Sequence, residues 1–150
     1  MAYAPLFLWT AVILVLGSSS GSMAQTSRII KPLIEFFFPV ASPETVLIVH
    51  AAIRKTAHFV EYAVLAMLAA RAYGRSASNW IRGKWPVWAL ITVVAVAAVD
   101  EFIQSFNVAR TGSPFDVLLD LAGGTAGLVL FAALARLRRQ RTTARQFVES

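Results

Sequence analysis

Long runs of apolar residues alternate with short polar connections along the chain. A transmembrane helix needs about 20 predominantly apolar residues. Four runs approach that length, at residues 3–17, 57–73, 85–106 and 116–137. The pattern therefore predicts an all-α, polytopic integral membrane bundle with about four transmembrane helices, which forms a single domain over residues 1–150.

The first apolar run has two interpretations. Ser22-Met23-Ala24 has the small-x-small form of a signal-peptide cleavage site, which would remove residues 1–24. No Lys or Arg precedes the apolar run, however, and signal peptides normally begin with a positive charge. The pattern favours a retained first helix, with the signal peptide as the alternative.

Residues 27–41 are hydrophobic but contain two prolines and three charged residues, which predicts an interfacial or re-entrant segment rather than a span. Next, Ser42-Pro43-Glu44 has the form of an N-cap, a proline in the first turn and an acidic residue after it. We expect a helix from Pro43 towards Arg71. It should be interfacial as far as Lys55 and embedded in the membrane from about Ala57.

The last two predicted spans have distinct features. Trp85 and Trp88 begin the third span as interfacial anchors, after a polar, basic loop at residues 74–84. Residues 107–114 form a turn-rich connection. Gly123, Gly124 and Gly127 lie on one side of the last span and would allow a neighbouring helix to approach closely. Residues 138–150 form a basic C-terminal tail.

Composition supports the membrane prediction, because 57% of the residues are hydrophobic and only 15% are charged. Soluble domains are typically about 45–50% apolar and about 25% charged. The chain has no cysteine, which excludes disulfides and thiolate metal sites within it. Its net charge of +6 comes from basic residues at the ends of apolar runs. That placement favours membrane lipid as a partner, and not nucleic acid.

The basic residues also predict an orientation. Residues 71–84 hold four Lys or Arg and residues 136–145 hold five, out of 14 in the chain. Both segments fall on the same side of a four-span bundle, which predicts a cytoplasmic C-terminus in a multi-pass cell-membrane protein. Arg54 and Lys55 lie at the opposite membrane edge and count against this orientation.

Polar residues interrupt the predicted spans at one membrane level. Because successive helices alternate in direction, the start of the second span, the end of the third and the start of the fourth share one side, here the outer side. A charge at depth costs roughly 2.5–3.5 kcal/mol, so such groups normally pair or line a wet cavity. The residues that converge there are His58, Glu61, Asp100, Glu101, Gln104, Arg110, Asp116 and Asp120.

These residue types suit two kinds of chemistry. The candidate acid–base residues are His58, Glu61, Asp100 and Glu101. Arg110 could bind a phosphate or carboxylate in a bidentate manner, and the other candidate ligand-binding residues are Lys55, Gln104, Asp116 and Asp120.

A divalent-metal site at His58 and the neighbouring carboxylates is a weaker hypothesis, because helical bundles usually build such sites from two His-containing motifs. His50, the second histidine, has no partner motif. We therefore predict no metal and no cofactor. A purely structural role also stays open, in which Arg110 bridges Asp116 and the cluster only holds the helices together.

Three segments resemble the VanZ-like family: residues 54–62 (RKTAHFVEY), 100–106 (DEFIQSF) and 110–117 (RTGSPFDV), followed by Asp120, Gly123 and Gly127. The resemblance covers roughly residues 50 to 130. It implies a small bacterial membrane protein, in a family named after a member linked to teicoplanin resistance. Its signature polar residues would be Lys55, His58, Glu61, Asp100, Glu101, Gln104, Arg110 and Asp116. The chain departs from the family in having Val108-Ala109 before the arginine, where Pro-Gly is frequent, and Asp120, where Asn is frequent.

The leading functional hypothesis is a protein that binds or acts on an envelope component, either lipid-linked or from the cell wall and anionic, through the outer-face cluster. A structural or assembly protein without a ligand is the alternative, and a small transporter is a third.

Overall fold

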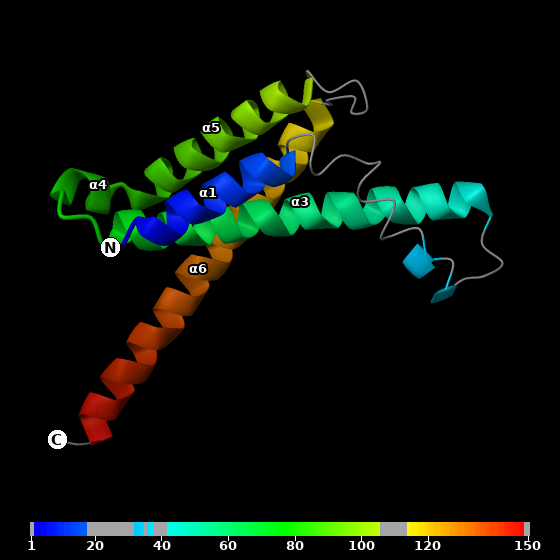
Figure 1. The fold of residues 1–150 in the computed structure, drawn as a ribbon. Helices are drawn as coiled ribbons and strands as arrows, with labels where there is room; N and C mark the ends of the chain where they lie inside the picture. Colours follow the sequence, from blue (N-terminus) through cyan, green and yellow to red (C-terminus); the bar gives the residue numbers. More distant parts are fainter. Residues whose placement is uncertain (1, 18–31, 35, 38–41, 106–113, 149–150) are drawn as a thin grey trace.

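The computed structural model describes residues 2–17, 32–34, 36–37, 42–105 and 114–148. Five helices account for most of them, and no strand occurs among these residues, which confirms the all-α prediction. The helices, labelled in Figure 1, are α1 (Ala4–Gly17), α3 (Pro43–Gly74), α4 (Asn79–Gly83), α5 (Trp85–Ser105) and α6 (Pro114–Val148).

Helix α3 begins where the sequence predicts. The Ser42 hydroxyl oxygen accepts a hydrogen bond of 3.2 Å from the Thr45 backbone N–H, which satisfies one of the unpaired donors of the first turn. The helix continues for 32 residues to Gly74, a length of about 48 Å. In Figure 1 its N-terminal part extends well beyond the other helices.

Helices α1, α3 and α5 lie side by side, and α6 crosses them and then runs away from the bundle (Figure 1). The core between them is built from fully buried Tyr62, Leu65 and Val93, with Ile13 of α1 packed against them. Buried alanines of α3, such as Ala66 and Ala69, keep the helices close, since a small side chain lets two backbones approach.

Gly123 and Gly127 of α6 make close backbone contacts with α3, as predicted, whereas Gly124 faces the Val93 side chain of α5. A Cβ atom at Gly123 would collide with the Phe59 carbonyl oxygen, and one at Gly127 would collide with the Ala63 carbonyl oxygen. Both partners belong to α3 and lie one turn apart, like the glycines themselves. The α3–α6 interface is therefore a direct backbone contact that no larger residue fits.

Two element boundaries differ from the sequence-based expectation. The polar connection before α5 contains the short helix α4, because the Ser78 hydroxyl oxygen accepts from the Ile81 N–H and starts a new helical turn. Helix α6 also continues to Val148 instead of giving way to a tail at residue 138. No Gly or Pro follows Gly127 in α6, so nothing in the sequence ends the helix earlier.

Two of the described helices are long and apolar enough to cross a membrane, namely α5 and residues Phe115–Thr143 of α6. Helix α1 is also apolar but has only 14 residues. The surface of the bundle is largely apolar: Phe7 and Leu8 of α1 are 69% and 70% exposed, whereas Asp100 and Asp120 are only 2% and 3% exposed. Apolar side chains outside and carboxylates inside suit lipid as the solvent.

Candidate functional site

The α3–α6 interface brings His58 and Asp120 together. Because Gly123 lies directly against Phe59, the residue one turn earlier in α6 comes to the side of His58. His58 Nδ1 is 3.3 Å from Asp120 Oδ1. The aspartate is almost completely buried, so its oxygen needs this partner to offset the cost of burial.

A second set of contacts joins α3 to α5. Gln104 Nε2 donates a hydrogen bond of 2.8 Å to Asp100 Oδ2, one turn away on α5. Arg54 Nη2 donates to Gln104 Oε1 over 3.5 Å. Arg54 is partly exposed, while Gln104 and Asp100 are buried. This Arg54–Gln104–Asp100 chain leads from the rim of the bundle to its interior.

Helix α1 also reaches the cluster, which the sequence analysis did not predict. A Cβ atom at Gly17 would overlap the Asp100 carboxylate, so the last residue of α1 lies against this side chain. Trp9 Nε1 donates a hydrogen bond of 3.0 Å to the Glu61 carbonyl oxygen. The first apolar helix is therefore packed into the same structure that holds the polar residues.

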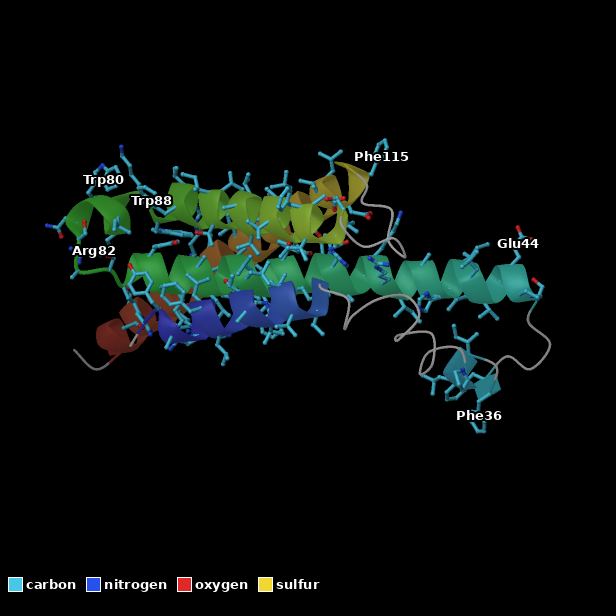
Figure 2. All side chains as sticks on the ribbon, turned by 45° about the horizontal axis from the view of Figure 1, so that its top comes forward. Phe36, Glu44, Trp80, Arg82, Trp88 and Phe115 are labelled. Atoms are coloured by element: carbon cyan, nitrogen blue, oxygen red, sulfur yellow. The ribbon has the colours of Figure 1, made fainter. Side chains whose placement is uncertain are left out.

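The remaining carboxylates lie in the same region. Glu61 and Asp100 are close enough to His58 for their charges to act on it, and Asp116 and Asp120 act similarly on Glu101. Figure 2 shows oxygen atoms gathered where α5 ends and α6 begins, near Phe115. The structure thus places the predicted acidic residues and His58 at one end of the α5–α6 pair.

Two further residues belong to this region and were not among the predicted site residues. The Tyr62 side chain is completely buried, and the charges of Asp100, Asp120 and Glu61 all act on its hydroxyl group. Arg54 contacts Gln104 directly. Helical spacing could have identified both, since residues 54, 58 and 62 follow one another at intervals of four along α3.

Other predicted features are only partly described. Lys55 is exposed next to Arg54. Three predicted features lie outside the described residues: Arg110, residues 107–113 of the connection, and the cleavage site after Ala24. Within the predicted interfacial segment, residues 32–34 and 36–37 are helical, and Phe36 and Phe37 are exposed.

The described residues contain no group of three or more His, Cys, Asp or Glu side chains placed to hold a metal ion. The contacts that are present join a base to an acid and an amide to a carboxylate. Such an arrangement can orient a proton donor or hold a polar ligand.

A family model for VanZ/LLP1 matches residues 3–136, most of the chain. The chain belongs to the VanZ/LLP1 family. The matched range extends from α1 into α6 and contains every residue of the cluster, which confirms the resemblance seen in the sequence motifs. No curated protein and no solved structure matches the chain significantly. VanZ/LLP1 membership and two long apolar helices fit an integral membrane protein.

Proposed function

We propose that the chain crosses the membrane four times, through α1, the C-terminal part of α3, α5 and α6, with the polar cluster on the outer side. Three observations support this topology. Helices α1 and α3 pack alongside α5 (Figure 1), and the bundle exterior is apolar. Nine of the 14 basic residues belong to residues 71–84 and 136–145, which favours a cytoplasmic location for that end.

In this arrangement the protein binds or acts on an anionic envelope component, lipid-linked or from the cell wall. The observation that carries the proposal is the Arg54–Gln104–Asp100 chain, which puts an exposed-to-buried series of polar groups inside an apolar bundle. Ionisable residues within membrane segments usually mark functional sites, because burying them without a use is costly.

The residues divide into two roles. Arg54 and Lys55 supply positive charge at the rim for a phosphate or carboxylate, and Arg110, outside the described residues, is a further candidate for the same role. Asp120 holds His58 through Nδ1, so Nε2 is the ring nitrogen that can exchange a proton with a ligand. Glu61 and Asp100 act on this histidine electrostatically, and the histidine acts on Glu101, so these three carboxylates are its candidate acid–base partners.

Co-purification tests the proposal. Wild-type protein, His58→Ala, Glu101→Ala and Arg110→Ala are extracted from membranes, and their bound lipids and glycans are compared by mass spectrometry. We expect one species to be lost from the variants at unchanged protein level, while Arg75→Ala, an exposed arginine at the other end, retains it. If all variants retain the same bound species, the proposed site is wrong. If only the amount of protein falls, the cluster has a structural role instead.

A further inference from the structure

The end of the bundle opposite the polar cluster carries only positive charge over two long segments. Residues 62–99 and 121–148 contain no Asp or Glu. A ring contact of 5.4 Å between Trp85 and Phe131 brings the start of α5 next to α6, just before the basic part of α6. The basic residues of the two segments are Arg71, Arg75, Arg82, Lys84, Arg136, Arg138, Arg139, Arg141 and Arg145.

Helix α4 holds two of these cations in defined positions. Arg82 donates hydrogen bonds to the Ser76 carbonyl oxygen, at 3.1 Å, and to the Asn79 side-chain oxygen. Lys84 Nζ lies over the Trp80 ring, 5.7 Å from its centroid. Both cations are nevertheless exposed. A cation that is already held in place loses less side-chain entropy when it binds an anion.

The tryptophans beside these cations lie at the edge of the apolar surface. Trp80 is 59% exposed and packs edge-to-face against Trp88, with ring centroids 5.0 Å apart. Figure 2 shows both rings and Arg82 at the end of the bundle away from Glu44. Exposed Val87 and Ile91 follow directly on α5. Exposed tryptophan next to an apolar belt is typical of the membrane–water interface.

We propose that this end of the molecule binds the head groups of anionic phospholipids. The binding surface consists of Trp80, Arg82 and Lys84 at α4, together with the basic segment of α6 at residues 136–145. The uniformly positive charge is complementary to those head groups. The neighbouring tryptophans and apolar side chains fit the glycerol and acyl regions of the lipid below its head groups. An acidic soluble protein would match the positive charge but has no such apolar region. Anionic lipid thereby collects around this end, whatever the polar cluster binds.

Tryptophan quenching by brominated lipids tests the proposal. The full-length protein is reconstituted in phosphatidylcholine vesicles containing the same mole fraction of either brominated phosphatidylglycerol or brominated phosphatidylcholine. Three of the four tryptophans, Trp80, Trp85 and Trp88, belong to this end, so emission reports mainly on the lipid around it. We expect stronger quenching by phosphatidylglycerol. Lys84→Gln should reduce this preference about fivefold, which corresponds to ~1 kcal/mol for one cation near the surface.

Lys84→Arg is the matched control, since it keeps an exposed positive charge at the same position and should leave the preference unchanged. High salt should weaken the wild-type preference, because it screens exposed charges. Equal quenching of the wild type by the two brominated lipids would overturn the proposal. An equal loss of the preference in Lys84→Arg and Lys84→Gln would also overturn it. Circular dichroism shows whether Lys84→Gln is folded. The salt dependence of the wild type decides the question even if that variant is not.

Discussion

At the residue scale, the polar side chains inside the bundle are held mainly by partners from other helices. Asp120 of α6 contacts His58 of α3, and Gln104 of α5 contacts Arg54 of α3. Removing one partner from a buried pair leaves the other polar group without a hydrogen bond. The resulting loss of stability is larger than the net stabilisation that the hydrogen bond provides. Substitutions that keep a hydrogen-bonding atom in place should therefore behave differently from substitutions that remove it.

Asp120 offers the simplest comparison. Asp120→Asn keeps an oxygen for His58, and we expect it to preserve the free energy of unfolding to within about 1 kcal/mol. Asp120→Leu leaves the imidazole without this partner and should lower that free energy by about 1–3 kcal/mol. Unfolding of the purified protein in detergent, followed by circular dichroism, measures both. Thr125→Val, at an exposed position on the same helix, is the control. An equal decrease of the unfolding free energy in Asp120→Asn and Asp120→Leu would contradict the expectation.

Gly17 is the second residue whose replacement has a defined consequence. In Gly17→Ala the new Cβ overlaps the Asp100 carboxylate, which should lower the free energy of unfolding by about 1–3 kcal/mol. Asp100→Ala removes the colliding atoms, so Gly17→Ala should have little further effect in that background. A loss of the same size in both backgrounds would show that Asp100 is not the cause. In the control Gly83→Ala, no described atom lies within 4 Å of the new methyl group.

At the scale of elements, the interface between α3 and α6 determines the geometry of the cluster. The glycines of α6 lie against carbonyl oxygens of α3, and a backbone atom cannot rotate away as a side chain can. The same approach that packs the helices also sets the separation of His58 and Asp120. The packing of α6 against α3 and the geometry of the His58–Asp120 pair therefore depend on the same helix–helix contact.

We accordingly expect Gly127→Ala to push α6 away from Ala63 and to lower the free energy of unfolding by about 1–3 kcal/mol. The comparison is Gly74→Ala at the end of α3, where no described atom lies within 4 Å of the added carbon. Thermal unfolding in detergent provides the measurement. Similar midpoints for the two variants would mean that the helices do not approach as closely as the structure indicates.

The sequence predicted elements better than it predicted their contacts. The start of α3 was predictable because Ser42-Pro43-Glu44 is a local signal, and the glycine contact followed from residue size. Helical spacing places Arg54 on the same face of α3 as His58, but its contact with Gln104 of α5 depends on how the helices pack and could not be predicted. Gly17 was missed because its contact joins residues 83 positions apart, and no local pattern records such a pairing.

At the scale of the whole molecule, the charges are divided between two ends. Carboxylates gather where α5 ends and α6 begins, with Arg54 and Lys55 beside them, whereas nine of the 14 basic residues belong to the segments of the opposite end. Figure 1 shows that α3 and α5 connect these two ends. If the protein spans the membrane as we propose, each end faces a different aqueous compartment.

Cysteine labelling can test this division, because the natural chain has no cysteine that would react in the background. Ala51→Cys and Ala77→Cys introduce one thiol each at exposed alanines on the two sides of the embedded part of α3. An impermeant maleimide should label position 51 in intact cells and position 77 only after permeabilisation. Labelling of both from the same side would contradict the four-span topology, and the shared outer-face site with it.

The uninterrupted length of α3 has a consequence for how a ligand arrives. About 11 residues precede Arg54 in this helix, so it rises roughly 16 Å above the rim of the cluster. An amphiphilic molecule could place its polar head group against this N-terminal part of α3 while its apolar tail stays among the acyl chains of the bilayer. The projecting part of α3 would then favour amphiphilic ligands over fully water-soluble ones, before the charged groups of the cluster make contact.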